Sequence, residues 1–278
     1  MYPYKYRPIV PIFRLKFIVS ALDVVRPKDH YFPGEMHDFW EMVFIADGEA
    51  CLTSDERVYH LKPGDLVLHR PMAFHRIWSS NDTCPHLKII SFVAEGEGME
   101  EVAEKVFSLD NLAVESVGEL NAAFKKVISL SKDPECSPSE YAYYSQKAAL
   151  LLENILLDLY DRKKQIGNHP TRSGRQYEQI VRVLNAHCRE ALTVEQIAQL
   201  CNLSVSNLKR VFHIYSDIGV MKYFTSVKLR CSMKELLTDK SIAQVSDELG
   251  FSSPSYFHTV FKKELGITPR EYIKNNKK

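Results

Sequence analysis

At 278 residues, with 45% hydrophobic and 26% charged residues, the chain has the composition of a globular protein and is long enough for roughly two domains. The formal net charge of +1 excludes a chain that is strongly acidic or basic throughout. The charge is unevenly divided: residues 175–278 carry 16 Lys and Arg against 10 Asp and Glu, and the residues before them carry 20 against 25. A basic C-terminal part suits phosphate binding, although such a surplus is also common on solvated surfaces.

The cysteines and the apolar runs indicate in which cellular compartment the protein is expected. Six cysteines are scattered without the paired spacing of a zinc site or a disulfide framework, which indicates reduced thiols. The apolar run 17–22 ends at Asp23, and no apolar run reaches the roughly 18 residues of a membrane span. We therefore expect a soluble, cytoplasmic protein without a membrane partner.

Residues up to about 95 favour an antiparallel β domain, because β-branched and aromatic residues stand in short runs between turn signals. The segment Lys62-Pro63-Gly64-Asp65 has the pattern of a type II turn, and Asp47-Gly48 marks another reversal. Short strands with this spacing predict a small sandwich or barrel.

From about residue 97 the apolar residues recur at helical spacing. Three stripes are visible: Met99, Val102, Val106 and Phe107; Leu120, Phe124, Val127 and Ile128; Ala149, Leu152, Leu156 and Leu159. The third has further leucines beside it, so it offers more apolar surface than one neighbour needs. Packing on the β domain and pairing with a second copy both remain open. A polar, basic linker follows at 161–175.

Two segments near the C-terminus predict helix-turn-helix motifs, at about 193–212 and 241–262. Capping boxes begin at Thr193 and Ser241, and their first helices end before Asn202 and Gly250, two residue types that tolerate the left-handed conformation. The motifs stand 48 residues apart before the turn and 49 after it, so the second turn has one more residue. A long helix between them would hold both in a fixed relation, which makes DNA binding the favoured function.

The second motif resembles the signature of AraC/XylS-type transcription regulators. The matching features are Gly250-Phe251, Ser255-Tyr256-Phe257, Phe261-Lys262-Lys263, Gly266, Thr268-Pro269 and Tyr272. The resemblance implies that the second helix of each motif contacts DNA, through Val205, Ser206, Asn207, Lys209 and Arg210 in the first copy and Pro254, Ser255, His258, Thr259, Lys262 and Lys263 in the second.

One departure from the family changes the expected roles of the two copies. The second copy has Thr259 where the family usually has arginine, whereas the first copy keeps Arg210. Arginine can make a bidentate contact to guanine and threonine cannot. We therefore expect the first copy to contribute more sequence discrimination, and the second to contribute phosphate contacts.

Residues 30–95 resemble the cupin-type sensor domain that often precedes such DNA-binding modules. In an extended strand Glu35, His37, Phe39 and Glu41 would share one face with Val43 and Ile45, and Trp40, Met42 and Phe44 would take the other. A barrel mouth with a few polar groups among apolar ones suits a small ligand. The candidate effector-binding residues are His37, Glu41, His75, Phe39 and Trp78, although the parity of Trp78 differs from that of His75.

Cupin enzymes hold a metal with a similar set of residues. Here Glu35 stands at the first histidine position, and His37, Glu41 and His75 match the others, so a divalent ion would find carboxylate and imidazole donors. The resemblance is to regulators whose barrels act without metal chemistry. We therefore expect no cofactor and no metal, and we expect hydrogen bonding inside the barrel or an effector site instead.

Together these features predict a non-enzymatic α+β protein. Its expected parts are a cupin-like antiparallel β-barrel at 1–95, a helical dimerisation segment at 96–160, a linker at 161–175 and an all-α DNA-binding domain at 176–278. Its expected partners are double-stranded DNA, a small effector such as a sugar, a second copy of the chain and, for an activator, RNA polymerase. The alternatives are a cupin metalloenzyme with a helical accessory domain and an interaction protein whose barrel only dimerises.

Overall fold

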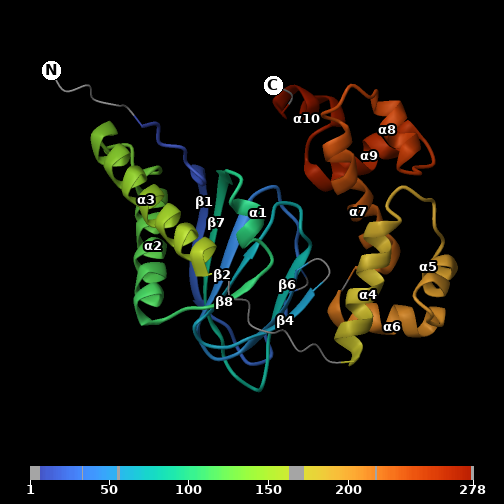
Figure 1. Ribbon diagram of the computed structural model, residues 1–278, viewed down its shortest axis with the longest axis horizontal. Helices are drawn as coiled ribbons and strands as arrows, with labels where there is room; N and C mark the ends of the chain where they lie inside the picture. Colours follow the sequence, from blue (N-terminus) through green and yellow to red (C-terminus); the bar gives the residue numbers. More distant parts are fainter. Residues whose placement is uncertain (1–6, 33, 55–56, 163–171, 217, 277–278) are drawn as a thin grey trace. The chain divides into compact units, whose positions relative to one another are not determined.

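The computed structural model describes residues 7–32, 34–54, 57–162, 172–216 and 218–276. These residues form two compact units, one built mainly on the strands and helices up to Arg162 and the other on the helices from Arg172 onward (Figure 1). Among the described residues, no helix combines the length and the apolar character that crossing a membrane requires.

The first unit contains eight described strands and three described helices. The strands are β1 (Arg14–Val25), β2 (Trp40–Asp47), β3 (Ala50–Ser54), β4 (Arg57–Leu61), β5 (Asp65–His69), β6 (His75–Ser79), β7 (His86–Glu95) and β8 (Val106–Ser108). The helices are α1 (Met99–Val102), α2 (Asn111–Leu130) and α3 (Pro138–Arg162).

The strands form two sheets. Five lie in the order β1-β7-β2-β5-β8 and three in the order β4-β3-β6. The fold class of the sequence prediction is confirmed, but the described strands do not close into one barrel. The type II turn before β5 is present: the Asp65 N–H donates to the Lys62 carbonyl over 3.0 Å, and Gly64 has φ of 90°.

Strand β2 separates two apolar cores, as the alternation in its sequence predicts. Trp40, Met42 and Phe44 belong to the core shared with the helices. Val43 and Ile45 point the other way, into a core that also contains residues of β3 and β4. Side chains of β2 with the parity of Val43, including Glu41, therefore lie between the two sheets.

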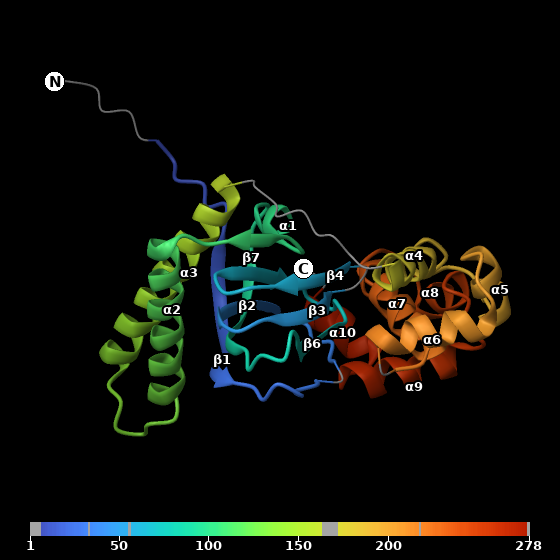
Figure 2. The same ribbon diagram turned by 90° about the horizontal axis from the view of Figure 1, so that it is seen from below.

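Helices α2 and α3 lie side by side against the five-stranded sheet (Figures 1 and 2). Most of the third apolar stripe packs onto this core: Leu152, Leu156 and Leu159 are buried. The prediction of one helix from Met99 to Phe107 was wrong. The backbone becomes extended at Ala103, and Phe107 lies in β8, which pairs with β5.

The second unit contains α4 (Arg172–Ala186), α5 (Val194–Leu200), α6 (Val205–Tyr215), α7 (Val220–Glu235), α8 (Ile242–Glu248), α9 (Pro254–Leu265) and α10 (Pro269–Asn276). The linker predicted at 161–175 falls mostly on residues outside the described ones. Of its two ends, residues 161–162 close α3 and residues 172–175 open α4.

An internal repeat organises the second unit. The rings of Phe212 and Tyr223 meet edge to face at 5.3 Å, and those of Phe261 and Tyr272, each 49 residues later, meet in the same way at 5.8 Å. The connecting helix α7 contributes Tyr223 to the first of these pairs and Leu229 to the core of the second motif. One helix therefore packs against both motifs.

Candidate functional site

The two predicted recognition helices are α6 and α9, and each is started by a serine cap. The Ser204 hydroxyl accepts from the Asn207 N–H over 3.2 Å, and the Ser253 hydroxyl accepts from the Tyr256 N–H over 3.1 Å. The first helices of the motifs begin at the predicted capping boxes, at Thr193 and Ser241. The sequence therefore fixes where all four helices of the two motifs begin.

The turns between these helices also follow the sequence. Asn202 and Gly250 are both left-handed, with φ of 53° and 62°. The next residues, Leu203 and Phe251, each donate an N–H to a carbonyl in the preceding helix. The second turn then has one additional residue, Ser252, before the cap. This is the insertion that the change of spacing from 48 to 49 predicts.

The candidate DNA-binding side chains lie on the solvent side of α6 and α9. Leu208 of α6 and Phe257 of α9 are fully buried. Most of the candidate DNA-binding residues lie on the other face of each helix, toward solvent. Those that are exposed are Ser206, Lys209, Arg210, Pro254, Ser255, His258, Thr259, Lys262 and Lys263, while Val205 and Asn207 are half-buried. This face could meet both base edges and phosphates.

Two hydrogen bonds distinguish the polar groups of the two helices. The Arg210 guanidinium donates to the Asn207 side-chain oxygen over 2.8 Å, which holds it along α6. The Thr259 hydroxyl donates to the Ser255 carbonyl over 3.0 Å, one helical turn back. The hydroxyl of Thr259 therefore has its proton engaged within α9, whereas Arg210 retains further N–H donors.

A polar latch, which sequence reasoning missed, fixes each turn from the helix that precedes the motif. In the first copy Gln179 of α4 donates to the Cys201 carbonyl over 3.3 Å. In the second, Lys228 of α7 donates to the Leu249 carbonyl over 2.7 Å and to the Gly250 carbonyl over 3.3 Å. Gln179 and Lys228 stand 49 residues apart and the accepting carbonyls of Cys201 and Leu249 stand 48 apart, so the latches are equivalent in place although their spacing differs by one residue.

Lys228 is an unusual component of this latch, because its side chain is only 6% exposed. Its ammonium lies 4.9 Å from the Phe224 ring centre and 5.7 Å from that of Phe251. Burial lowers its pKa from the ordinary value. The signal in the sequence was a lysine between Val227 and Leu229, two buried apolar positions of α7.

In the first unit, a buried pair of a glutamate and a histidine spans the two sheets. Glu41 of β2 and His75 of β6 place Oε1 and Nε2 3.1 Å apart, with 9% and 5% of their side chains exposed. The Ser91 hydroxyl donates to the other Glu41 oxygen over 3.3 Å. The His75 ring also stacks on that of His69, with centres 4.4 Å apart. The sequence predicted Glu41 and His75 but missed Ser91 and His69.

The contacts of His75 define what the pair can bind. Its Nδ1 lies 3.0 Å from the Ala73 carbonyl, which can only accept, so Nδ1 carries a proton. Nε2 then faces a Glu41 oxygen. A lone pair on Nε2 would repel the carboxylate oxygen at this distance. The pair therefore requires a proton shared by the two atoms, or a cation or donor group bound to both.

Two other predicted residues of this site, Glu35 and His37, converge on the Glu41–His75 pair. Donor atoms of Glu35 and His37 join those of Glu41 and His75 within 4.8 Å of one another, a set that fits a divalent ion. Glu35, His37 and half-buried Phe39 precede β2 instead of forming a continuous strand with it. The predicted continuous strand was therefore wrong, whereas Glu35, His37 and Glu41 do converge as side chains on one face would.

Trp78 has a different environment from His75. The Arg76 guanidinium lies 4.9 Å from the Trp78 ring centre and 4.3 Å from that of Tyr31. Residues 76 and 78 of β6 have the same parity, opposite to that of residue 75. Trp78 is therefore stacked under an arginine on the strand face that His75 does not share.

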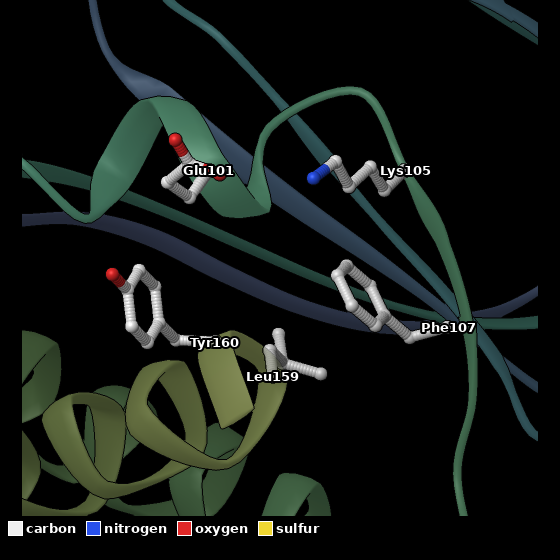
Figure 3. A pocket seen from close by; sticks show the side chains of 5 residues that line it. All are labelled: Glu101, Lys105, Phe107, Leu159 and Tyr160. Carbon is white, nitrogen blue, oxygen red and sulfur yellow. The ribbon is translucent and has the colours of Figure 1, made fainter. Parts of the chain in front are cut away.

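A cavity that the sequence did not suggest lies where α1, β8 and α3 meet. It has a volume of about 230 Å³ and is lined by Glu101, Lys105, Phe107, Leu159 and Tyr160. Figure 3 shows the two charged side chains on one side and the two α3 side chains on the other. No sequence pattern links three elements this far apart.

Comparison with known families agrees with this description of both units. Residues 18–159 match the family model of the AraC-like ligand binding domain, just over half of the chain, and residues 197–275 match that of the helix-turn-helix domain. The chain belongs to the AraC family of transcription regulators. It is a DNA-binding regulator with a ligand-binding domain, as the resemblance in its sequence implies.

Among individual relatives, the chain is 24% identical over 273 residues to the HTH-type transcriptional activator RhaR of Escherichia coli, a match that covers 92% of this chain and 93% of RhaR. Among solved structures it is similar to ToxT of Vibrio cholerae O395, with 15% identity, 95% and 97% of the two chains covered and a TM-score of 0.39. An AraC-type regulator of Chromobacterium violaceum is 30% identical, with 36% of this chain and 90% of that chain covered and a TM-score of 0.35.

The latch on the second motif leads to a first prediction. Lys228→Met keeps the apolar stem but removes both hydrogen bonds, and we expect the free energy of unfolding of the DNA-binding unit to fall by about 2 kcal/mol. Lys228→Gln installs the residue of the first copy and should recover part of this loss. Denaturant unfolding of both variants measures the effect, and a Met variant as stable as the parent would show that the latch does not hold the turn.

Proposed function

We propose that this chain is a transcription activator which binds DNA as a homodimer and responds to a small polyhydroxylated metabolite such as a sugar. The observation that carries the proposal is the doubled motif: two capped recognition helices with exposed polar faces, held by the one helix α7. Family membership provides the ligand-binding domain. Activation is proposed from RhaR, whose name describes an activator.

The proposed mechanism is a shift between two arrangements of the dimer. The effector binds the arrangement for which it has the higher affinity and so increases its population. That arrangement sets the spacing of the DNA-binding units on their half-sites, and the bound dimer recruits RNA polymerase. The parts expected at 1–95, 96–160 and 176–278 divide these tasks into sensing, pairing and DNA recognition.

The effector site that we propose is centred on Glu41 and His75. A sugar hydroxyl beside the pair would donate to the Glu41 carboxylate and accept from His75 when that ring is protonated. Burial excludes water from the pair and makes these hydrogen bonds stronger than they would be at the surface. His37 and Phe39 enclose the ligand, and Trp78 contributes if its arginine is displaced.

The surface proposed for dimerisation is the exposed side of α3. Tyr143, Leu150 and Leu157 are 63%, 58% and 47% exposed, and they are separated by seven residues each. A seven-residue apolar repeat forms one seam along a helix, and two such seams pack as in a coiled coil. The stripe of Leu152, Leu156 and Leu159 faces the sheet, so α3 has apolar residues on both sides.

For DNA recognition, Arg210→Ala should reduce the preference for operator over random duplex by roughly 10-fold or more, because a bidentate contact to guanine is lost. Lys262→Ala should weaken both complexes alike and lower the salt slope of log K by about 0.9. Operator sequences selected from a random pool allow both measurements by titration, and Lys234→Ala in α7 is the control. A normal preference in Arg210→Ala would disprove the proposed division between the two copies.

For the effector, one sugar or related metabolite of a panel should raise the melting temperature of the parent. Glu41→Gln and His75→Ala should abolish this shift, whereas His86→Ala, at the exposed pair with Asp23, should keep it. A panel without any stabilising compound would favour the interaction protein.

Metal analysis of the same protein tests the metalloenzyme, which requires stoichiometric iron, manganese or nickel that is lost in His37→Ala.

For the dimer, the double variant Leu150→Glu and Leu157→Glu should shift the mass in solution from two chains to one, because two charges would be buried in the seam. Leu112→Glu, at an exposed leucine of α2, is the matched control and should leave the mass unchanged. Sedimentation equilibrium measures the mass. A double variant that remains dimeric would place the interface elsewhere on the chain.

A further inference from the structure

Two thiols in the DNA-binding unit lie unusually close together. Cys188 follows α4, in the turn that leads to α5, and Cys231 lies within α7. Their sulfur atoms are 2.7 Å apart, with the Cys231 thiol donating to Cys188. This distance is only about 0.7 Å longer than a disulfide bond. Cys188 is buried and Cys231 is half-buried, so solvent reaches the pair from the α7 side.

Polar contacts on both sides hold the two segments in this position. The Arg230 guanidinium donates to the Asn185 side chain over 3.2 Å. Arg189 forms ion pairs with Glu235 at the end of α7 and with Glu248 of α8. The residues beside each cysteine are therefore tied to the segment that carries the other, and the sulfur atoms meet because the surrounding framework aligns them.

The roles of the two sulfur atoms differ. Burial, together with the hydrogen bond to Cys188, raises the pKa of Cys231 to about 12. Cys231 therefore retains its proton at neutral pH and acts as the donor. Cys188 is the acceptor of that hydrogen bond, so the two sulfur atoms already face each other.

We propose that Cys188 and Cys231 form an oxidisable dithiol, a modification site that hydroperoxides convert to an intramolecular disulfide. The thiolate of one of the two cysteines attacks one peroxide oxygen, the O–O bond breaks, and the other oxygen leaves as water or an alcohol with the proton that this thiol gave up. The sulfur of the second cysteine then attacks the sulfenic acid, the S–O bond breaks, and hydroxide leaves as water with the proton of the second thiol. Two thiols and one hydroperoxide thus give one disulfide, one alcohol or water, and one water.

The position of the disulfide gives it a defined effect on the fold. The covalent loop from residue 188 to residue 231 contains α5 and α6, which are the whole first motif. Closing such a loop restricts the unfolded chain, so the oxidised DNA-binding unit should melt roughly 5 °C or more above the reduced one. Arg210 lies inside the loop, and the second recognition helix lies outside it.

The test uses the full-length reduced protein, titrated with hydrogen peroxide near equimolar amounts. Remaining thiols are then alkylated in denaturant, and peptides are mapped by mass spectrometry. The expected result is a Cys188–Cys231 cross-linked peptide from a monomeric band on a non-reducing gel, with the other four of the six cysteines alkylated. Cys84→Ser, at an exposed thiol, should form the same cross-link, and Cys188→Ser should not.

Several outcomes would overturn the proposal. Full alkylation of both cysteines after peroxide treatment would exclude the disulfide, as would sulfinic acid at either cysteine without a cross-link. A link of either residue to another cysteine would show that the geometry does not direct the reaction. The peptide map of the unsubstituted chain decides the question by itself, so the test does not depend on the folding of a variant.

Discussion

The hydrogen bond from a preceding helix to the carbonyl before a left-handed turn residue is the constraint that fixes the turn in both helix-turn-helix motifs. A recognition helix reads bases only when its angle to the first helix of the motif is fixed, and that angle is set by one or two turn residues. Lys228 and Gln179 fix it from outside the motif. Because α7 also packs against both motifs, the orientation of each recognition helix is tied to one common element.

The first unit uses a buried Glu–His pair in a comparable way, to connect its two sheets. Glu41 and His75 come from different sheets, and their mutual position depends on how these sheets pack. A ligand that changes the charge or spacing of this pair would act on both sheets at once. Helices α2 and α3 cover the opposite face of the larger sheet, so the strands that carry Glu41 pack against the helix proposed for dimerisation.

Much of the second unit could be predicted from the sequence because local chemistry determines it. Serine and threonine caps, Asn202 and Gly250 each act within four residues, and the structure has helices and turns where they predict them. The latches could not be predicted, because they join residues more than twenty positions apart. In the first unit β8 was misread as helix, since its few apolar residues satisfy helical spacing and its pairing with β5 is not local. The segment before β2 failed for a similar reason, because alternation alone does not show that a strand is paired.

The repeated scaffold is separate from the side chains that face solvent, and this separation affects how such a regulator can change its target. Both motifs have equivalent hydroxyl caps, the same edge-to-face ring pair and equivalent latches, so the scaffold is independent of the side chains that face solvent on α6 and α9. Substitutions on those faces do not disturb the helix starts or the buried rings. The base preference of each motif can therefore change independently, while the shared helix α7 keeps the two motifs in a fixed relative position. A duplicated unit can in this way adopt a new, asymmetric operator one half at a time.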